Sequence, residues 1–201
     1  QFELLGAMVL NNARAIGQSR NPMRCLQLLS ASGVAIPATV MAREASELKA
    51  MVSLVGGVPV LVKLLQGQER KGVMVCETLQ SLEATLQAVL GLGQNLIVQQ
   101  YVKTRGADVR VFVVGGKALC AVRRHPTTNR LRRSLHKGAR LEKMTLAAPL
   151  KAAAEKSAVL CELEVCAVDM LDVKGPPRVF EINSSPAITE MENATGVDLA
   201  G

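Results

Sequence analysis

Aromatic side chains are scarce in this chain of 201 residues. It contains no Trp, one Tyr and three Phe, so aromatic residues make up only 2% of the sequence. Proteins that bind single-stranded nucleic acid stack the bases on aromatic side chains. The sequence therefore argues against a nucleic-acid partner, although its formal net charge is +7. This charge favours anionic partners such as phosphates or polycarboxylates, and charge alone does not choose among them.

Histidine is also rare, and no long apolar run is present. The chain has two His and five Cys, and no two Cys form a C-x-x-C motif, so neither a zinc site nor a disulfide framework is indicated. This cysteine usage is typical of a reducing compartment, and we expect a cytoplasmic location. No apolar run approaches the roughly 18 residues of a membrane span, and the N-terminus lacks the basic region of a signal peptide.

Helix and strand patterns, separated by Gly and Pro, predict an α+β fold. Three pairs of β-rich runs read as antiparallel hairpins, at 58–65 with 73–76, 108–114 with 117–124, and 165–173 with 178–183. Helical patterns run from Asn21 to a stop at Gly33 and over 46–55, 79–90 and 147–163. This order is neither a regular βαβ alternation nor all-β. It is typical of two α+β lobes with a cleft between them.

Three oxygen-bearing side chains lie in the last predicted hairpin. Asp169 and Glu181 are in two apolar strands joined by a Pro-containing turn, and Asn183 follows Glu181 by two residues, which places both on one face of a strand. Mg²⁺ prefers such hard oxygen ligands and is normally shared with a nucleotide. A metal site is therefore favoured over the alternative that these are ordinary polar residues at strand ends.

Several basic residues are candidate phosphate contacts. Lys63 lies in the apolar run VPVLVKLL just before a Gly-bounded turn, and Asp108 and Arg110 alternate along another strand. Lys63 is equally consistent with a lysine at a strand edge, and Asp108 and Arg110 with a surface ion pair. The polar stretch 125–140 could clamp an anion through Arg132, Arg133 and Lys137, or it is a solvated loop. No nucleophile stands beside a base, so a hydrolase triad is not indicated.

Five segments together resemble the RimK family of ATP-grasp ligases. They are VPVLVKLLQGQERKGVMV, QYVKTRGADVRVFVVGG, RRSLHKGA, CAVDMLDV and VFEINSSPAITEMENATGVDLAG. The resemblance covers the chain from about Asn21 onward and is most specific at its end. It implies an ATP-grasp fold of two α+β lobes with the nucleotide in the cleft. The segments would then be residues 1–20 as the remnant of a preceding domain or linker, 21–95 as a small lobe with a phosphate flap, and 96–201 as a large lobe with the magnesium site.

The resemblance also implies an activity and a set of site residues. The family activates a carboxylate with ATP as an acylphosphate, which an amine attacks, so we expect glutamate or a similar acidic amino acid to be joined to a peptide or small amine. Two Mg²⁺ ions, with Mn²⁺ as an alternative, would bind at Asp169, Glu181 and Asn183. The remaining implied roles are phosphate contact by Lys63, an adenine-side hinge at Gln100, Tyr101 and Val102, ribose binding by Asp108, closure on the phosphates by Arg132, Arg133 and Ser134, and charge stabilisation by Arg110 and Arg132.

The chain departs from the family pattern at several of these points. Asn21-Pro22 stands where the family usually has Asp-Lys, the flap is QGQERKG, and Ser134 replaces an Asn. These departures support an alternative, in which a degenerate ATP-grasp module binds nucleotide or an acidic partner without catalysis. The complete set of Asp169, Glu181 and Asn183 supports the ligase. The sequence leaves the acceptor and the oligomeric state open, a homo-oligomer included.

Overall fold

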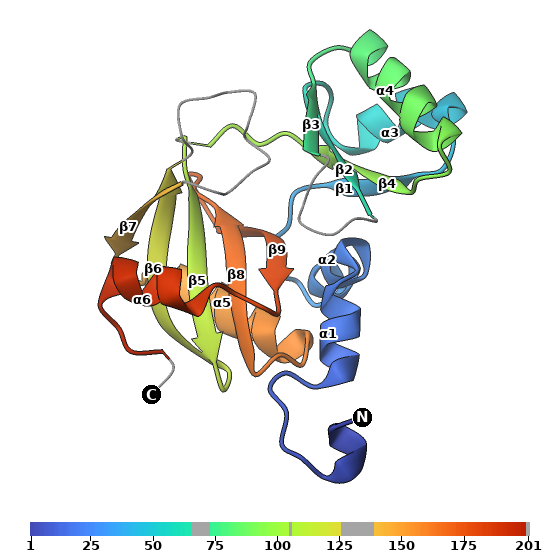
Figure 1. The fold of residues 1–201 in the computed structure, drawn as a ribbon. Helices are drawn as coiled ribbons and strands as arrows, with labels where there is room; N and C mark the ends of the chain where they lie inside the picture. The colour runs from blue at the N-terminus through green and yellow to red at the C-terminus, as the bar shows by residue number, and fades with distance from the viewer. Residues whose placement is uncertain (66–72, 105, 126–138, 200–201) are drawn as a thin grey trace. The chain divides into compact units, whose positions relative to one another are not determined.

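Two antiparallel sheets organise the residues that the computed structural model describes, which are 1–65, 73–104, 106–125 and 139–199 (Figure 1). Each sheet belongs to its own unit. The first unit contains residues 1–36, 104–125 and the described residues from 140 onward, and the second contains the described residues from 37 to 103. Each unit buries an apolar core of its own.

The second unit is a four-stranded sheet covered by helices. Its strand order is β1-β4-β2-β3, all antiparallel, and its elements are β1 (Thr39–Ala42), η2 (Ala45–Glu47), α3 (Leu48–Leu54), β2 (Val60–Leu64), β3 (Val73–Cys76), α4 (Leu79–Gly91) and β4 (Leu96–Gln100). Alternation along β2 decides which face is covered: Val60 and Val62 are fully buried in the core with Leu82 and Leu86 of α4. Lys63 therefore projects from the opposite face of the sheet.

The first unit is built on a five-stranded sheet of order β7-β6-β5-β8-β9. Its elements are η1 (Glu3–Leu5), α1 (Ala13–Ser19), α2 (Pro22–Ala31), β5 (Asp108–Val114), β6 (Lys117–His125), β7 (Arg140–Met144), α5 (Ala148–Leu160), β8 (Val165–Leu171), β9 (Arg178–Asn183) and α6 (Ile188–Thr195). All neighbouring strands are antiparallel. The hairpin turn between β5 and β6 uses Gly115 and Gly116, both with positive φ, as a two-residue turn of this kind requires.

Helices cover both faces of this sheet (Figure 1). On one face, α5 and α2 pack against Val109, Val111 and Val168. On the other, α6 packs through Met191 against Phe112 of β5 and the apolar residues of β6. Asp108 and Arg110 of β5, Asp169 of β8 and Glu181 of β9 lie on the same face of the sheet as Phe112, which is the α6 face.

The division into units differs from the three segments expected from the sequence. Residues 1–36 belong to the first unit, because α2 buries Cys25 and Leu29 in its core and the Val179 amide of β9 donates to the Ala35 carbonyl, 2.9 Å away. Strand β4 belongs to the second unit, because it is hydrogen-bonded between β1 and β2. Neither a lobe that starts at residue 21 nor one that starts at residue 96 matches this packing.

Most of the predicted elements are confirmed, and apart from the short η1, three elements were not predicted. The three hairpins form, and α2 begins as expected, with the Asn21 side chain accepting from the Arg24 amide at 3.1 Å and Pro22 in the first turn. The unpredicted elements are α1, β7 and α6. Strand β7 is mostly charged, with the sequence RLEKM, and forms through pairing with β6 rather than through an apolar pattern.

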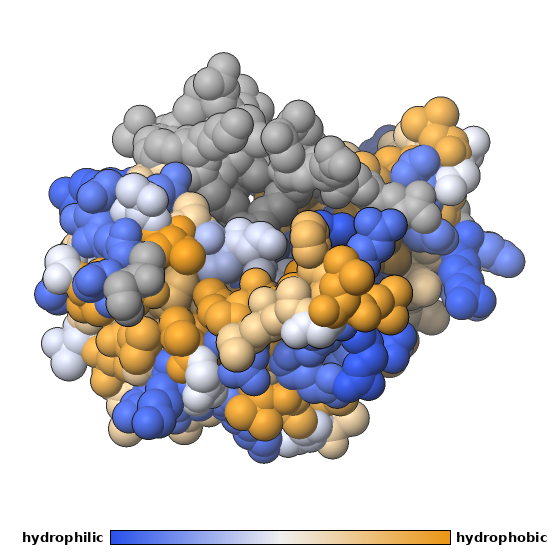
Figure 2. Space-filling model, turned by 60° about the horizontal axis from the view of Figure 1, so that its bottom comes forward, coloured by the Kyte–Doolittle hydropathy of each residue, from blue (hydrophilic) through white to orange (hydrophobic). Residues whose placement is uncertain are grey.

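The surface mixes apolar and charged residues. Figure 2 shows both kinds side by side on the face that it presents. The N-terminal residues Phe2, Leu4, Leu5 and Met8 are each more than two-thirds exposed. Among the described helices, none is both long enough and apolar enough to cross a membrane.

Candidate nucleotide and metal site

The central polar group of the first unit follows from strand register. Arg110 of β5 lies directly opposite Asp169 of β8, and Asp169 lies opposite Glu181 of β9. Residues paired directly across antiparallel strands project from the same face. The register shifts immediately after Asp169, so a bulge interrupts the β8–β9 ladder at this point. The sequence-predicted residues Arg110, Asp169 and Glu181 are therefore brought together in one row across three strands.

Asp169 is fully buried and held by a two-pronged contact with Arg110. Arg110 Nε lies 2.7 Å from Asp169 Oδ1, and Arg110 Nη2 lies 2.8 Å from Oδ2. Burial acts to lower the pKa of Arg110, but the hydrogen bonds and the negative charge of Asp169, together with the charges of Glu181 and Asp108, raise it. Arg110 is therefore a fixed positive charge beside the carboxylates of Asp169, Glu181 and Asp108.

Arg124 of β6 joins this group, although the sequence analysis did not select it. Its Nε lies 2.5 Å from Asp108 Oδ1, and its Nη2 lies 3.0 Å from Asp169 Oδ2. The second approach lacks hydrogen-bond geometry, and within the described part of the chain neither Arg124 Nη1 nor Nη2 has a hydrogen-bond partner, although the residue is only 3% exposed. Buried N–H groups without a hydrogen bond are costly, and a bound water or anion would satisfy them.

Asp108 is placed at the edge of the same group. It lies opposite Arg124 in the β5–β6 pairing, on the same face as Arg110. Burial raises the pKa of Asp108, and the charge and hydrogen bond of Arg124 act in the opposite direction. The sequence-based alternative of an ion pair with Arg110 is replaced by one with Arg124, because cross-strand neighbours are closer than residues two apart on one strand.

The oxygen donors of this face fit Mg²⁺. Glu181 and Asn183 share a face of β9 with Asp169 opposite Glu181, and Asn183 Oδ1 accepts from the Ser185 amide at 3.0 Å, which orients its side chain. In the described residues no three His, Cys, Asp or Glu side chains gather as a metal cluster, so any ion held here relies on two carboxylates and an amide oxygen. Three carboxylates against two guanidinium groups leave a negative charge that a divalent cation offsets.

The second unit presents Lys63, together with a residue that the sequence analysis missed. Lys63 Nζ lies 2.7 Å from Oε1 of Gln99, which is only 1% exposed. Gln100, the expected hinge residue, pairs with Val60 and so projects from the opposite face, where its Nε2 lies 3.6 Å from where a Cβ on Gly56 would be. Tyr101 and Val102 follow the end of β4 and are half-buried.

These observations can be compared with known proteins. A RimK-like ATP-grasp domain model matches residues 19–201. The chain belongs to the RimK-like ATP-grasp family. "Probable alpha-L-glutamate ligase" proteins of Teredinibacter turnerae and Methanococcoides burtonii are 41% and 38% identical to this RimK-like chain over 202 residues, with all of the chain covered. The chain spans 67% of the length of each of these relatives.

Solved structures show the same fold. The ATP-grasp ligase PsnB complexed with a minimal precursor matches 98% of the RimK-like chain with a TM-score of 0.77 and 24% identity, and the chain covers 62% of that protein. D-alanine–D-alanine ligase from Bacillus anthracis, complexed with ATP, matches 94% of the chain with a TM-score of 0.75 and 20% identity, with 63% of that protein covered. The expected ATP-grasp fold is therefore confirmed.

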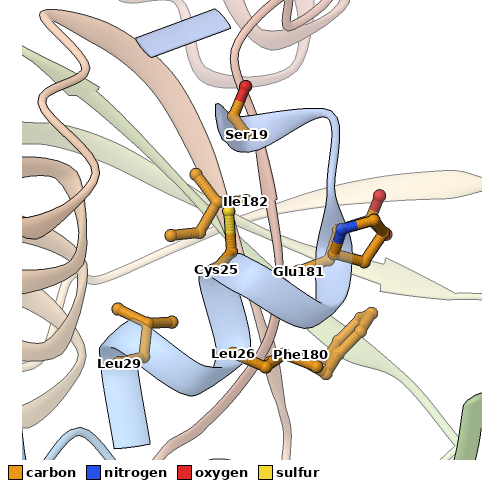
Figure 3. Close-up of a pocket in the computed structure, with 8 residues that line it drawn as sticks. Ser19, Cys25, Leu26, Leu29, Phe180, Glu181 and Ile182 are labelled. Atoms are coloured by element: carbon orange, nitrogen blue, oxygen red, sulfur yellow. The ribbon is translucent and has the colours of Figure 1, made fainter. Parts of the chain in front are cut away.

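Some expected site residues of the RimK-like domain lie outside the described residues. These are Arg132, Arg133 and Ser134, and the flap at 66–72. An open pocket of about 310 Å³, with the solvent space at its mouth included, lies beside β9 in the first unit (Figure 3). Cys25, Leu26 and Leu29 of α2 line it together with Phe180 and Ile182, and Glu181 and Ser19 are its polar members. Its lining is mostly apolar, and Glu181 belongs both to this lining and to the charged group on the sheet.

Proposed function

We propose that this RimK-like domain binds ATP with Mg²⁺ as part of a ligase that joins a carboxylate to an amine. The reaction adds glutamate or a similar acidic amino acid to a peptide or small amine. The observation that carries the proposal is the buried charged group around Asp169, in which the Arg124 Nη atoms have no hydrogen-bond partner among the described residues. The names of the relatives and the ATP-bound fold neighbour support it.

Each unit contributes residues to this proposal. In the first unit, Asp169, Glu181 and Asn183 hold Mg²⁺, and Asp108 binds the ribose. In the second unit, Lys63 contacts the phosphates. The other assigned roles are adenine contact by Gln100, Tyr101 and Val102, and phosphate contact by Arg132, Arg133 and Ser134. Mg²⁺, when bound, offsets phosphate charge and orients the oxygens for transfer.

The proposed chemistry proceeds in two steps. An oxygen of the substrate carboxylate attacks the γ-phosphorus of ATP, the bond to the bridging oxygen breaks, and ADP leaves with formation of the acylphosphate. The amine nitrogen then attacks the acyl carbon, phosphate leaves, and the amine loses a proton as the amide forms. Arg110 and Arg132 stabilise the negative charge that these steps spread over the phosphate oxygens. The fixed charge of Arg110, held by Asp169, makes it suited to this role.

A nucleotide-binding module without catalysis is the second candidate. The observation that favours it is the start of α2, where Asn21 and Pro22 serve as helix cap and first turn and bring no ammonium group to this position. Release of ADP in the presence of glutamate and an amine or peptide distinguishes the two candidates. ATP binding without any ADP release above background, across a panel of acidic amino acids and acceptors, favours the module.

The experiment that tests the nucleotide and metal site is titration of ATP into the protein by calorimetry, with and without Mg²⁺. We expect saturable binding that Mg²⁺ strengthens. Glu181→Gln should weaken the Mg²⁺-dependent part by at least about tenfold, since even residues that only support metal ligands cost about 10–100-fold. Glu190→Gln, the same change on an exposed residue of α6, should bind as the wild type does. Equal affinity of the Glu181→Gln and wild-type proteins contradicts the metal assignment.

A further inference from the structure

Three side chains form a continuous hydrogen-bonded row across the sheet of the second unit. Lys63 Nζ on β2 donates to Gln99 Oε1 on β4 at 2.7 Å. Gln99 Nε2 donates to Thr39 Oγ1 on β1 at 2.8 Å, and Thr39 Oγ1 donates to the Pro37 carbonyl at 2.8 Å. The row therefore connects the ammonium group of Lys63, through one amide, to a fixed point of the main chain.

The chemistry of the groups fixes the orientation of the amide. An ammonium group only donates, so the Gln99 oxygen must face Lys63. The Thr39 hydroxyl uses its hydrogen on the Pro37 carbonyl, so it can only accept from Gln99, and the amide nitrogen must face Thr39. A reversed amide would place donor against donor at Lys63. The row thus has a single arrangement.

The position of Gln99 is unusual for an amide side chain. It is only 1% exposed, in a strand whose neighbours Ile97 and Val98 are buried and apolar. Burying an amide is unfavourable unless both of its ends are hydrogen-bonded. An apolar residue of similar volume would fill this position without that requirement. The Gln99 amide therefore acts on Lys63 in addition to packing within the strand.

We propose that Gln99, anchored by Thr39, is a positioning residue that holds the Lys63 ammonium group in place for the nucleotide phosphates. This inference rests on the proposed function of Lys63. A lysine side chain has four rotatable bonds and loses much freedom when it binds a phosphate. Because Gln99 restrains the ammonium group beforehand, less of that freedom is lost on binding. Gln99 then affects phosphate binding only through Lys63.

A double-mutant cycle on ATP affinity tests the inference. Gln99→Met should weaken ATP binding by about tenfold, the scale of a lost hydrogen bond to a charged group. In the Lys63→Met background the same change should have no further effect on ATP affinity, because Gln99 then has no ammonium group to position. Gln87→Met, the same change on an exposed residue of α4, is the control. An equal loss in both backgrounds overturns the inference in favour of a structural role.

A second readout does not depend on ATP. Limiting acetic anhydride acetylates free amines, and mass spectrometry gives the rate at each lysine. Gln99→Met should raise the rate at Lys63 severalfold relative to exposed Lys117, with Gln87→Met unchanged. An unchanged rate at Lys63 overturns the inference. Failure of the wild-type protein to bind ATP overturns the proposed function instead, and the labelling result then still decides whether Gln99 holds Lys63.

Discussion

Among single residues, Asp169 affects both the stability of the fold and the proposed metal site. Asp169 is fully buried against Arg110 and Arg124, so it stabilises the fold as well as being a proposed metal ligand. A buried charge whose partner is removed has no compensation from water. Loss of activity on substitution of Asp169 therefore has two explanations. Glu181, at the sheet edge and less deeply buried, separates metal binding from stability more cleanly.

Asp169→Asn is expected to lower the free energy of unfolding by about 3–5 kcal/mol, because it leaves two buried guanidinium groups facing a neutral amide. Urea unfolding followed by circular dichroism measures the change. Glu190→Asn, on the exposed surface of α6, should stay within about 0.5 kcal/mol of the wild type. A loss at Asp169 as small as that of the control would show that the buried ion pairs contribute nothing net.

The buried cysteines should differ in reactivity. A hydrogen bond from Cys161 lowers the pKa of Cys25, whereas burial raises the pKa of Cys166 to about 12. At pH 8 only about one Cys166 in 10⁴ is then a thiolate, the reactive form. Iodoacetamide with peptide mapping should modify Cys25, which lines the pocket beside β9, faster than Cys166. Raising the pH toward 12 should narrow the difference, and urea should abolish it. Equal rates in the folded protein at pH 8 would contradict this assignment.

Among the elements, local signals in the sequence predicted the capped start of α2, the helix α4 and the three strand pairs. Asn21 and Thr78 cap α2 and α4, and Thr78 forms a capping box with Ser81. Turns with positive-φ glycines, Gly115-Gly116 and Gly175, likewise join β5 to β6 and β8 to β9. These signals act between residues that are close in sequence, so they can be recognised from the sequence before the fold is known. Strand β7 and helix α6 carry no such signal: β7 forms by pairing with β6, and α6 is held by Met191 against the sheet.

Thr78→Ala is expected to lower the free energy of unfolding by about 1 kcal/mol, since the first turn of α4 loses its side-chain acceptor. Chemical unfolding measures this directly. Glu83→Ala, on an exposed position inside the same helix, separates the cap from helix propensity and should leave stability within about 0.5 kcal/mol. A cap that contributes nothing would give the same stability for both variants.

At the scale of the whole molecule, the chain passes between units rather than completing one before the next. Residues 1–36 begin the first unit, the chain then builds the second unit from residue 37 onward, and β9 later packs against residues 1–36. The two cores share no residue, with Leu82 and Leu86 in one and Val168 and Ile182 in the other. We therefore expect a substitution in one core to destabilise mainly the unit that contains it.

Leu82→Ala should destabilise the second unit by about 2–5 kcal/mol through the cavity that it leaves. Amide hydrogen exchange is expected to speed up in β2 and β4 while β5 and β8 stay protected. Val168→Ala is the reciprocal variant and should affect β5 and β8 instead. Uniform loss of protection across both sheets in either variant would show that the units unfold as one.

The cap of α2, the three strand pairs and the shared face of Glu181 and Asn183 could be read from the sequence, because alternation along a strand and turn chemistry act over a few residues. Packing between distant segments was needed to show that Arg124 reaches Asp108 and Asp169, that Gln99 rather than Gln100 meets Lys63, and that α2 belongs with β9. Each of these depends on the register or packing of strands distant in sequence. A shift of one residue in that register would turn every one of these side chains to the opposite face.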